Sequence, residues 1–146
     1  EADREIAAHL PALEAVPIHV NDTLYYCTAL NRVFALDPST GREKWVFDPH
    51  ASSDGADARV RAGSRALVSV PRKSGICRGV AYWQSAAPRP GIACDKRIFK
   101  SDVHGHVFAI DADTGAACRD FGAAAGHPGY VTHEDFDARG TNDPAR

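Results

Sequence analysis

The sequence predicts an all-β protein built from short antiparallel strands, and two observations carry this prediction. Apolar residues occur in short runs between turn residues, and 12 Gly and 9 Pro interrupt a chain of 146 residues. This pattern is typical of many short strands rather than of long helices. In addition, residues 21–41 align without a gap on residues 95–115, so the chain contains an internal repeat with an offset of 74 residues.

The first 16 residues form an N-terminal segment of a different kind. Ile6, Leu10 and Leu13 fall near one face of a helix spanning Ala2 to Ala15, but Pro11 lies inside it. Because proline removes a backbone donor and clashes with the preceding turn, only a short or broken helix is expected in residues 1–16.

Each copy of the repeat has the same order of strands and turns. Val33-Phe34-Ala35 recurs as Val107-Phe108-Ala109, and both copies continue into Asp-x-x-Thr-Gly. An aspartate at the head of such a turn can accept backbone N–H bonds, and the glycine can adopt a positive φ at its end. The predicted strands are 24–27, 32–36 and 44–47 in the first copy, and 98–100, 106–110 and 118–121 in the second.

Three antiparallel strands in a row form a meander, and repeated meanders are the layout of propeller blades. We therefore expect one blade repeat at residues 17–49 and another at 93–122, about two blades in all. In the third strand Phe47 corresponds to Phe121, whereas Arg119 replaces Trp45.

The remaining segments are expected to lie mainly outside the blades. Residues 50–92 are interpreted as inter-blade loops that include one strand at 76–83, because small, polar and proline-rich stretches flank this apolar run. Residues 123–146 are polar, lack a clear strand pattern and are predicted to be a loop-like or disordered tail.

Composition excludes several classes of function. Seventeen Lys+Arg against 19 Asp+Glu give a net charge of −2, which removes the electrostatic basis for a nucleic-acid partner or a polybasic membrane surface. No apolar run approaches the roughly 18 residues of a membrane span. The chain also lacks the nucleophile-elbow, P-loop, zinc-protease and dinucleotide-binding motifs.

Four cysteines leave the redox state open at this stage. None forms a Cys-x-x-Cys pair or a zinc-like spacing with histidine. They are either buried free thiols or form one or two disulfides in an oxidising compartment, and three complete pairings remain possible. The four are Cys27, Cys77, Cys94 and Cys118.

Arg78 is the first candidate for a binding residue, since its guanidinium can clamp a carboxylate or phosphate and Gly79 would allow close approach. From the residues alone, an exposed structural arginine is the simpler interpretation. Two groups of His and acidic residues could be offered as metal sites. In the first group the aspartates are explained as turn residues, and in the second the side chains are explained as solvated residues of a polar tail. The first comprises Asp102, His104, Asp111 and Asp113, and the second His127, His133, Glu134, Asp135 and Asp137.

Four segments, in order, resemble the pyrroloquinoline quinone (PQQ)-dependent dehydrogenases, most closely their membrane-bound glucose, quinate and polyol branch. The segment Cys77-Arg-Gly-Val-Ala-Tyr82, together with the cysteine-bearing flanks, is the most specific part of this resemblance. The repeat resembles the tryptophan-docking repeat of these proteins. The four segments are 17–28, 31–49, 77–82 and 94–122.

The resemblance implies an eight-bladed propeller with PQQ and a calcium ion near its axis. It also implies that Arg78 contacts an acidic group of PQQ, a cofactor with three carboxylates. The catalytic aspartate and the calcium ligands are expected in later blades, so no metal ligand is assigned in this chain. The absence of two adjacent cysteines shortly before Arg78 points away from methanol and ethanol enzymes.

The function implied is oxidation of a small polyhydroxy substrate such as a sugar, polyol or cyclic hydroxy acid, with electrons passed to a membrane quinone. The location implied is the periplasmic side of a bacterial inner membrane, with the anchor outside this chain. The chain itself is expected to be an inactive fragment, a truncated product or a degenerate copy that needs the remaining blades or self-association to cover its sheet edges. The alternative is a non-catalytic propeller segment that acts as a binding scaffold.

Overall fold

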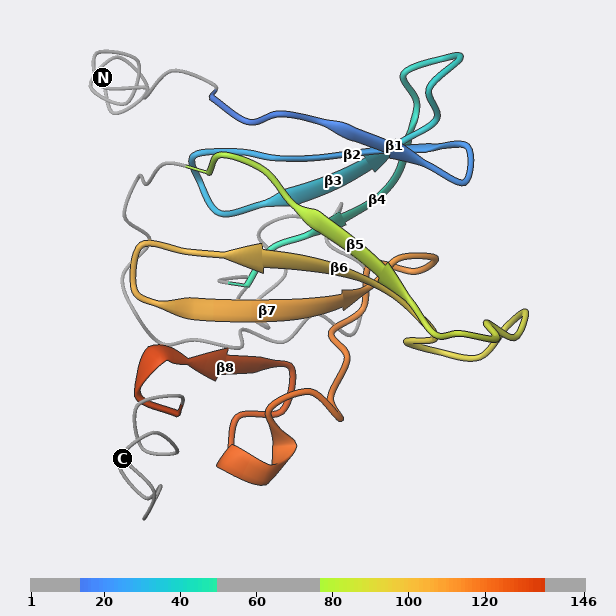
Figure 1. The fold of residues 1–146 in the computed structure, drawn as a ribbon. Helices are drawn as coiled ribbons and strands as arrows, with labels where there is room; N and C mark the ends of the chain where they lie inside the picture. Colours follow the sequence, from blue (N-terminus) through green and yellow to red (C-terminus); the bar gives the residue numbers. More distant parts are fainter. Residues whose placement is uncertain (1–13, 50–76, 136–146) are drawn as a thin grey trace, which may run out of the picture.

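A computed structural model describes residues 14–49 and 77–135, and these form two four-stranded antiparallel sheets (Figure 1). Apart from a 3₁₀ helix, η1 (Ala123–Ala125), and three helical residues at 133–135, the assigned elements are strands, which confirms the all-β prediction. The first sheet contains β1 (Ile18–Val20), β2 (Thr23–Cys27), β3 (Val33–Leu36) and β4 (Glu43–Phe47). The second contains β5 (Ala81–Gln84), β6 (Lys96–Ser101), β7 (His106–Asp111) and β8 (Tyr130–Thr132).

The two copies of the repeat fold with the same register. Leu24 pairs with Leu36 in the first sheet, and Ile98 pairs with Ile110 in the second. Both residues of the second pair lie 74 positions after those of the first, so the sequence repeat corresponds to a structural repeat. The central hairpins, β2–β3 and β6–β7, are therefore equivalent.

The repeated aspartates form the turns that the sequence predicts. Asp37 Oδ1 accepts hydrogen bonds from the Ser39 amide at 2.9 Å, the Thr40 amide at 2.9 Å and the Thr40 hydroxyl at 3.0 Å. These bonds favour the ionised carboxylate and lower the pKa of Asp37. Asp111 Oδ1 makes the same set of contacts in the second copy. A turn role thus accounts for both aspartates.

The outer edge of the second sheet differs from the prediction. Residues 118–121 do not form a strand: the Cys118 amide donates to the Ala109 carbonyl at 2.8 Å, and the chain then turns away. β8 takes the place of this strand, with Val131 paired to Val107. Cys118, from which the chain leaves β7, is bonded to Cys94, which precedes β6.

The prediction of a polar tail at 123–146 is accordingly wrong over residues 130–132. The run Tyr-Val-Thr has the β-branched and aromatic residues that favour strands, and Val131 is buried in the second sheet. Gly122 and Gly126, both with positive φ, flank η1 and reverse the chain before this strand. Residues 136–146, and with them Asp137, lie outside the described part.

Two further strands complete the sheets on the side opposite β4 and β8. β1 pairs with β2, and β5 pairs with β6. The strand predicted at 76–83 is observed as β5 at residues 81–84, so it belongs to the second sheet rather than to a loop. The helix predicted in residues 1–16 and much of the segment 50–92 lie outside the described residues. Among the described residues, no helix is long and apolar enough to cross a membrane.

The two sheets pack with non-equivalent faces. The first sheet buries odd-numbered residues such as Tyr25 and Phe47 in the common core, whereas the second buries even-numbered ones such as Ile98 and Phe108. The Phe47 and Phe108 rings lie 6.0 Å apart across the contact. Because the repeat offset of 74 is even, equivalent residues have the same parity, and the two copies therefore contact each other through opposite faces of their sheets. Such a head-to-tail contact can continue from blade to blade and close into a ring.

Trp45 of β4 holds the two sheets together at one end. Its Nε1 donates to the Ala112 carbonyl at 3.0 Å, and the Tyr25 hydroxyl donates to the same oxygen at 3.1 Å. The indole ring lies against Gly115, where an added Cβ would come within 2.8 Å of ring atoms. Gly115 of the second repeat therefore ends a turn and also leaves the space in which Trp45 of the first repeat packs.

Candidate cofactor site

Arg78 lies just before β5, where the chain passes from the first sheet to the second. Its carbonyl accepts a hydrogen bond from the Val16 amide at 3.0 Å, and Val16 forms a parallel bridge with Gly79. The Arg78 side chain is exposed. Within residues 14–49 and 77–135, no acidic group forms an ion pair with it. The guanidinium thus remains available for an anionic ligand.

A disulfide fixes the residue before Arg78. Cys77 is bonded to Cys27 at the end of β2, across 50 residues of sequence, with a Cα–Cα distance of 5.9 Å. Cys27 is fully buried and Cys77 is 5% exposed. The two sulfur atoms lie 3.4 and 3.5 Å from the Gly79 carbonyl oxygen. Arg78 is therefore an exposed cation next to a cysteine that a buried disulfide attaches to the core.

Gly79 leaves space beside this segment. Among the described residues, an added Cβ would meet the Val16 carbonyl oxygen alone, at 3.5 Å, which is an ordinary contact. An alanine at this position would therefore fit without distortion.

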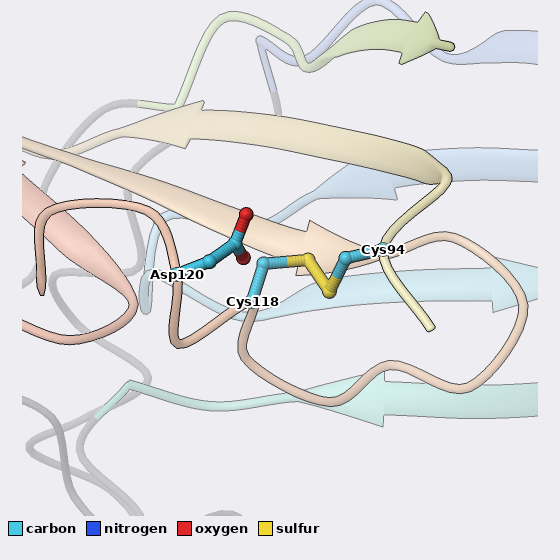
Figure 2. Close-up of side chains that lie close together, drawn as sticks. All are labelled: Cys94, Cys118 and Asp120. Atoms are coloured by element: carbon cyan, nitrogen blue, oxygen red, sulfur yellow. A yellow bond between two sulfur atoms is a disulfide. The ribbon is translucent and has the colours of Figure 1, made fainter. Parts of the chain in front are cut away.

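The second disulfide joins Cys94, before β6, to Cys118, after β7. The observed pairings, Cys27–Cys77 and Cys94–Cys118, select one of the three that the sequence left open. Asp120 lies beside the second disulfide (Figure 2), and the three side chains form the one group of possible metal-ligating atoms found within 4.8 Å among the described residues. Sulfur in a disulfide is not a thiolate ligand, and Asp120 pairs with Arg97. This group is therefore not a metal site.

The structure does not bring the first acidic group together as a metal site. Asp111 and Asp113 are turn residues, and Asp113 pairs with Lys96 at 3.1 Å. Asp102 accepts a bond from His106 Nδ1 at 2.9 Å. Burial opposes ionisation of Asp102, but this bond and two backbone bonds outweigh it and lower the pKa of the carboxyl. These acids stabilise hairpins.

The second group proves to be part of the attachment of β8. His127 Nδ1 lies 3.2 Å from Asp135 Oδ2, which also accepts the Thr132 amide at 2.7 Å. The His127 ring stacks on Tyr130 with centroids 5.0 Å apart. His133 and Glu134 are exposed, and the described residues form no metal cluster there.

Sequence reasoning missed a buried cation between the sheets. Lys100 of β6 is 1% exposed, and its Nζ lies 2.7 Å from Asn31 Oδ1 and 5.6 Å from the centre of the Phe108 ring. Burial lowers the pKa of Lys100 to about 8, against the opposing charges of Asp102 and Asp48. Strand alternation places Lys100 on the same face as Ile98, but the sequence does not show that the neighbouring sheet covers this face.

Arg78 and both copies of the repeat lie in the part of the chain that matches a known protein family. A family model described as "PQQ: Glucose/ethanol/alcohol dehydrogenase, beta-propeller domain" matches residues 2–131. The chain belongs to this family. The match confirms the resemblance inferred from Cys77-Arg-Gly-Val-Ala-Tyr82 and from the repeat.

Curated relatives carry names consistent with the sugar, polyol and quinate branch. The quinoprotein glucose dehydrogenase of Escherichia coli (strain K12) is 36% identical over 112 residues, covering 74% of this chain and 12% of that protein. The glycerol dehydrogenase large subunit of Gluconobacter thailandicus is 32% identical, covering 82% of this chain and 14% of that protein. The quinate/shikimate dehydrogenase (quinone) of Acinetobacter baylyi is 28% identical, covering 75% and 13% respectively.

The chain therefore spans between 12% and 14% of the length of these relatives. Two blades of a family propeller account for the described residues.

Proposed function

We propose that this chain is the part of a PQQ-dependent dehydrogenase that supplies Arg78 to the cofactor. The observation that carries the proposal is the family match over residues 2–131, which includes the segment around Arg78. The exposed guanidinium on a disulfide-held segment supports it. When bound, PQQ supplies the two-electron oxidising capacity, and the role of this chain is to bind and orient one of its carboxylates.

The proposed substrate is a sugar, polyol or cyclic hydroxy acid, and the proposed electron acceptor is a quinone. The relatives named for glucose, glycerol and quinate support this substrate class, and one of them is named for a quinone. The catalytic base and the calcium ligands would lie in the rest of the dehydrogenase. We further propose a location on the periplasmic side of the inner membrane, supported by two disulfides, which persist in oxidising compartments.

The test is a PQQ titration of the full-length apo-dehydrogenase that contains this chain. Arg78→Ala removes a charge-assisted bond to a carboxylate, worth roughly 1.5–3 kcal/mol, so affinity should fall about 10- to 150-fold. Arg78→Lys should recover only part of the loss, because an ammonium cannot pair bidentately. Arg119→Ala is the matched control, since Arg119 is also exposed but lies on another loop.

The proposal is refuted if Arg78→Ala leaves PQQ affinity and turnover unchanged in a folded protein. That result would favour the alternative, in which the chain belongs to a non-catalytic propeller scaffold. A second variant probes the neighbouring backbone: Gly79→Ala fits the fold, so a loss of PQQ affinity in this variant would show that the cofactor approaches Gly79.

A further inference from the structure

We propose that the Cys27–Cys77 disulfide is a positioning element for Arg78, fixing its backbone against the first blade so that the guanidinium meets its ligand preorganised. This inference rests on the proposed function of Arg78. It goes beyond that function because it gives a role in cofactor binding to two buried residues that touch no cofactor.

The contacts around Arg78 define the anchoring. The segment 77–79 joins the first sheet at two points, the disulfide to Cys27 and the bridge from Val16 to Gly79. The bridge is a single pair outside the named strands, with one hydrogen bond of 3.0 Å from the Val16 amide to the Arg78 carbonyl. The Val16 side chain is 67% exposed, so little packing supports this bond. The disulfide is accordingly the stronger of the two attachments.

The location of the disulfide fits positioning better than general stabilisation of either sheet. Cys27 ends β2 of the first sheet, whereas Cys77 precedes β5 of the second, so the bond joins the first sheet to the segment that leads into the second. The bonded cysteine is directly adjacent to Arg78. A side chain whose backbone is fixed loses less conformational freedom on binding, and preorganisation of this kind raises affinity.

The second disulfide provides a matched control within the same chain. Cys94–Cys118 closes a 24-residue separation inside the second copy and lies beside Arg97 and Asp120 rather than Arg78. Removing it should cost stability as well. A general effect of losing a disulfide can thus be separated from an effect on the Arg78 segment.

The first experiment measures anchoring without any cofactor. In Cys27→Ser/Cys77→Ser, amide hydrogen exchange at Val16 should accelerate about tenfold or more, because its bond to Arg78 would open locally. In Cys94→Ser/Cys118→Ser the Val16 amide should exchange as in the wild type. Should the serine variant fail to fold, Cys27→Val/Cys77→Ala keeps apolar groups at both core positions and serves the same purpose.

The second experiment measures PQQ affinity of the full-length apo-dehydrogenase in a double-mutant cycle. Removal of Cys27–Cys77 should weaken PQQ binding about tenfold, and removal of Cys94–Cys118 should leave it within about twofold. In an Arg78→Ala background, removal of Cys27–Cys77 should have no further effect, because the disulfide acts only through Arg78.

The outcomes separate the inference from the proposed function. Unchanged Val16 exchange in the Cys27–Cys77 variants overturns the anchoring, whatever PQQ does. Faster Val16 exchange with unaltered PQQ affinity, while Arg78→Ala still weakens binding, overturns the positioning role and leaves the proposed function standing. Unaltered affinity in Arg78→Ala overturns the proposed function, and with it the positioning role.

Discussion

Alanine substitutions at Gly41 and Gly115 test how closely the two blades pack, through their effects on the free energy of unfolding. They end equivalent turns, with φ of +70° and +77°. An added Cβ at Gly41 meets no atom of residues 14–49 or 77–135 within 4 Å, whereas at Gly115 it comes 2.8 Å from two ring atoms of Trp45. Replacing each by alanine therefore applies the same backbone penalty with and without a steric conflict between the blades.

The expected magnitudes follow from these two terms. A left-handed alanine costs roughly 1–2 kcal/mol, which is the whole effect expected for Gly41→Ala. Gly115→Ala adds an overpacking cost of about 1–3 kcal/mol, because Trp45 is buried and its Nε1 is bonded to the Ala112 carbonyl. The free energy of unfolding should therefore fall by about 1–3 kcal/mol more in Gly115→Ala than in Gly41→Ala.

The assay is urea denaturation followed by far-UV circular dichroism, in the full-length protein or in the longest soluble segment that contains both repeats. The double variant Gly115→Ala/Trp45→Ala is the internal check, since removing the ring should abolish the excess cost of the alanine. If Gly115→Ala destabilises no more than Gly41→Ala, the tryptophan does not seat on Gly115 and the packing of the two sheets inferred above is incorrect.

Three other predictions follow from contacts across and within the sheets. Lys100 binds fewer protons in the native than in the unfolded state between its lowered pKa of about 8 and its ordinary value, so stability should rise over that pH range by up to about 3 kcal/mol. Denaturation at pH 7.5 and 10 should show the rise in the wild type and not in Lys100→Met. Trp45→Phe should cost about 1 kcal/mol beyond lost packing by thermal unfolding, and a much larger loss would mean that the Tyr25 bond fails to satisfy the Ala112 carbonyl. Non-reducing peptide mapping should recover Cys27–Cys77 and Cys94–Cys118, and any other pair would contradict the fold.

The sequence by itself determined the repeated hairpins. The ungapped repeat predicted β2–β3 and β6–β7 with one register, because strand alternation and the Asp-x-x-Thr-Gly turn are local properties that a short segment contains in full. It also indicated the family, because the residues flanking Arg78 form a recognisable family segment.

Only the tertiary structure decided what depends on residues distant in the chain. Which cysteines pair depends on where β2 ends and β5 begins in space, and the spacing of the cysteines does not specify this. The edge of β7 pairs with β8 rather than with residues 118–121, and this choice between two segments appears only in the folded chain. Lys100 is buried for the same reason, because the burial of a strand position depends on the face that the neighbouring sheet covers, which no local pattern contains.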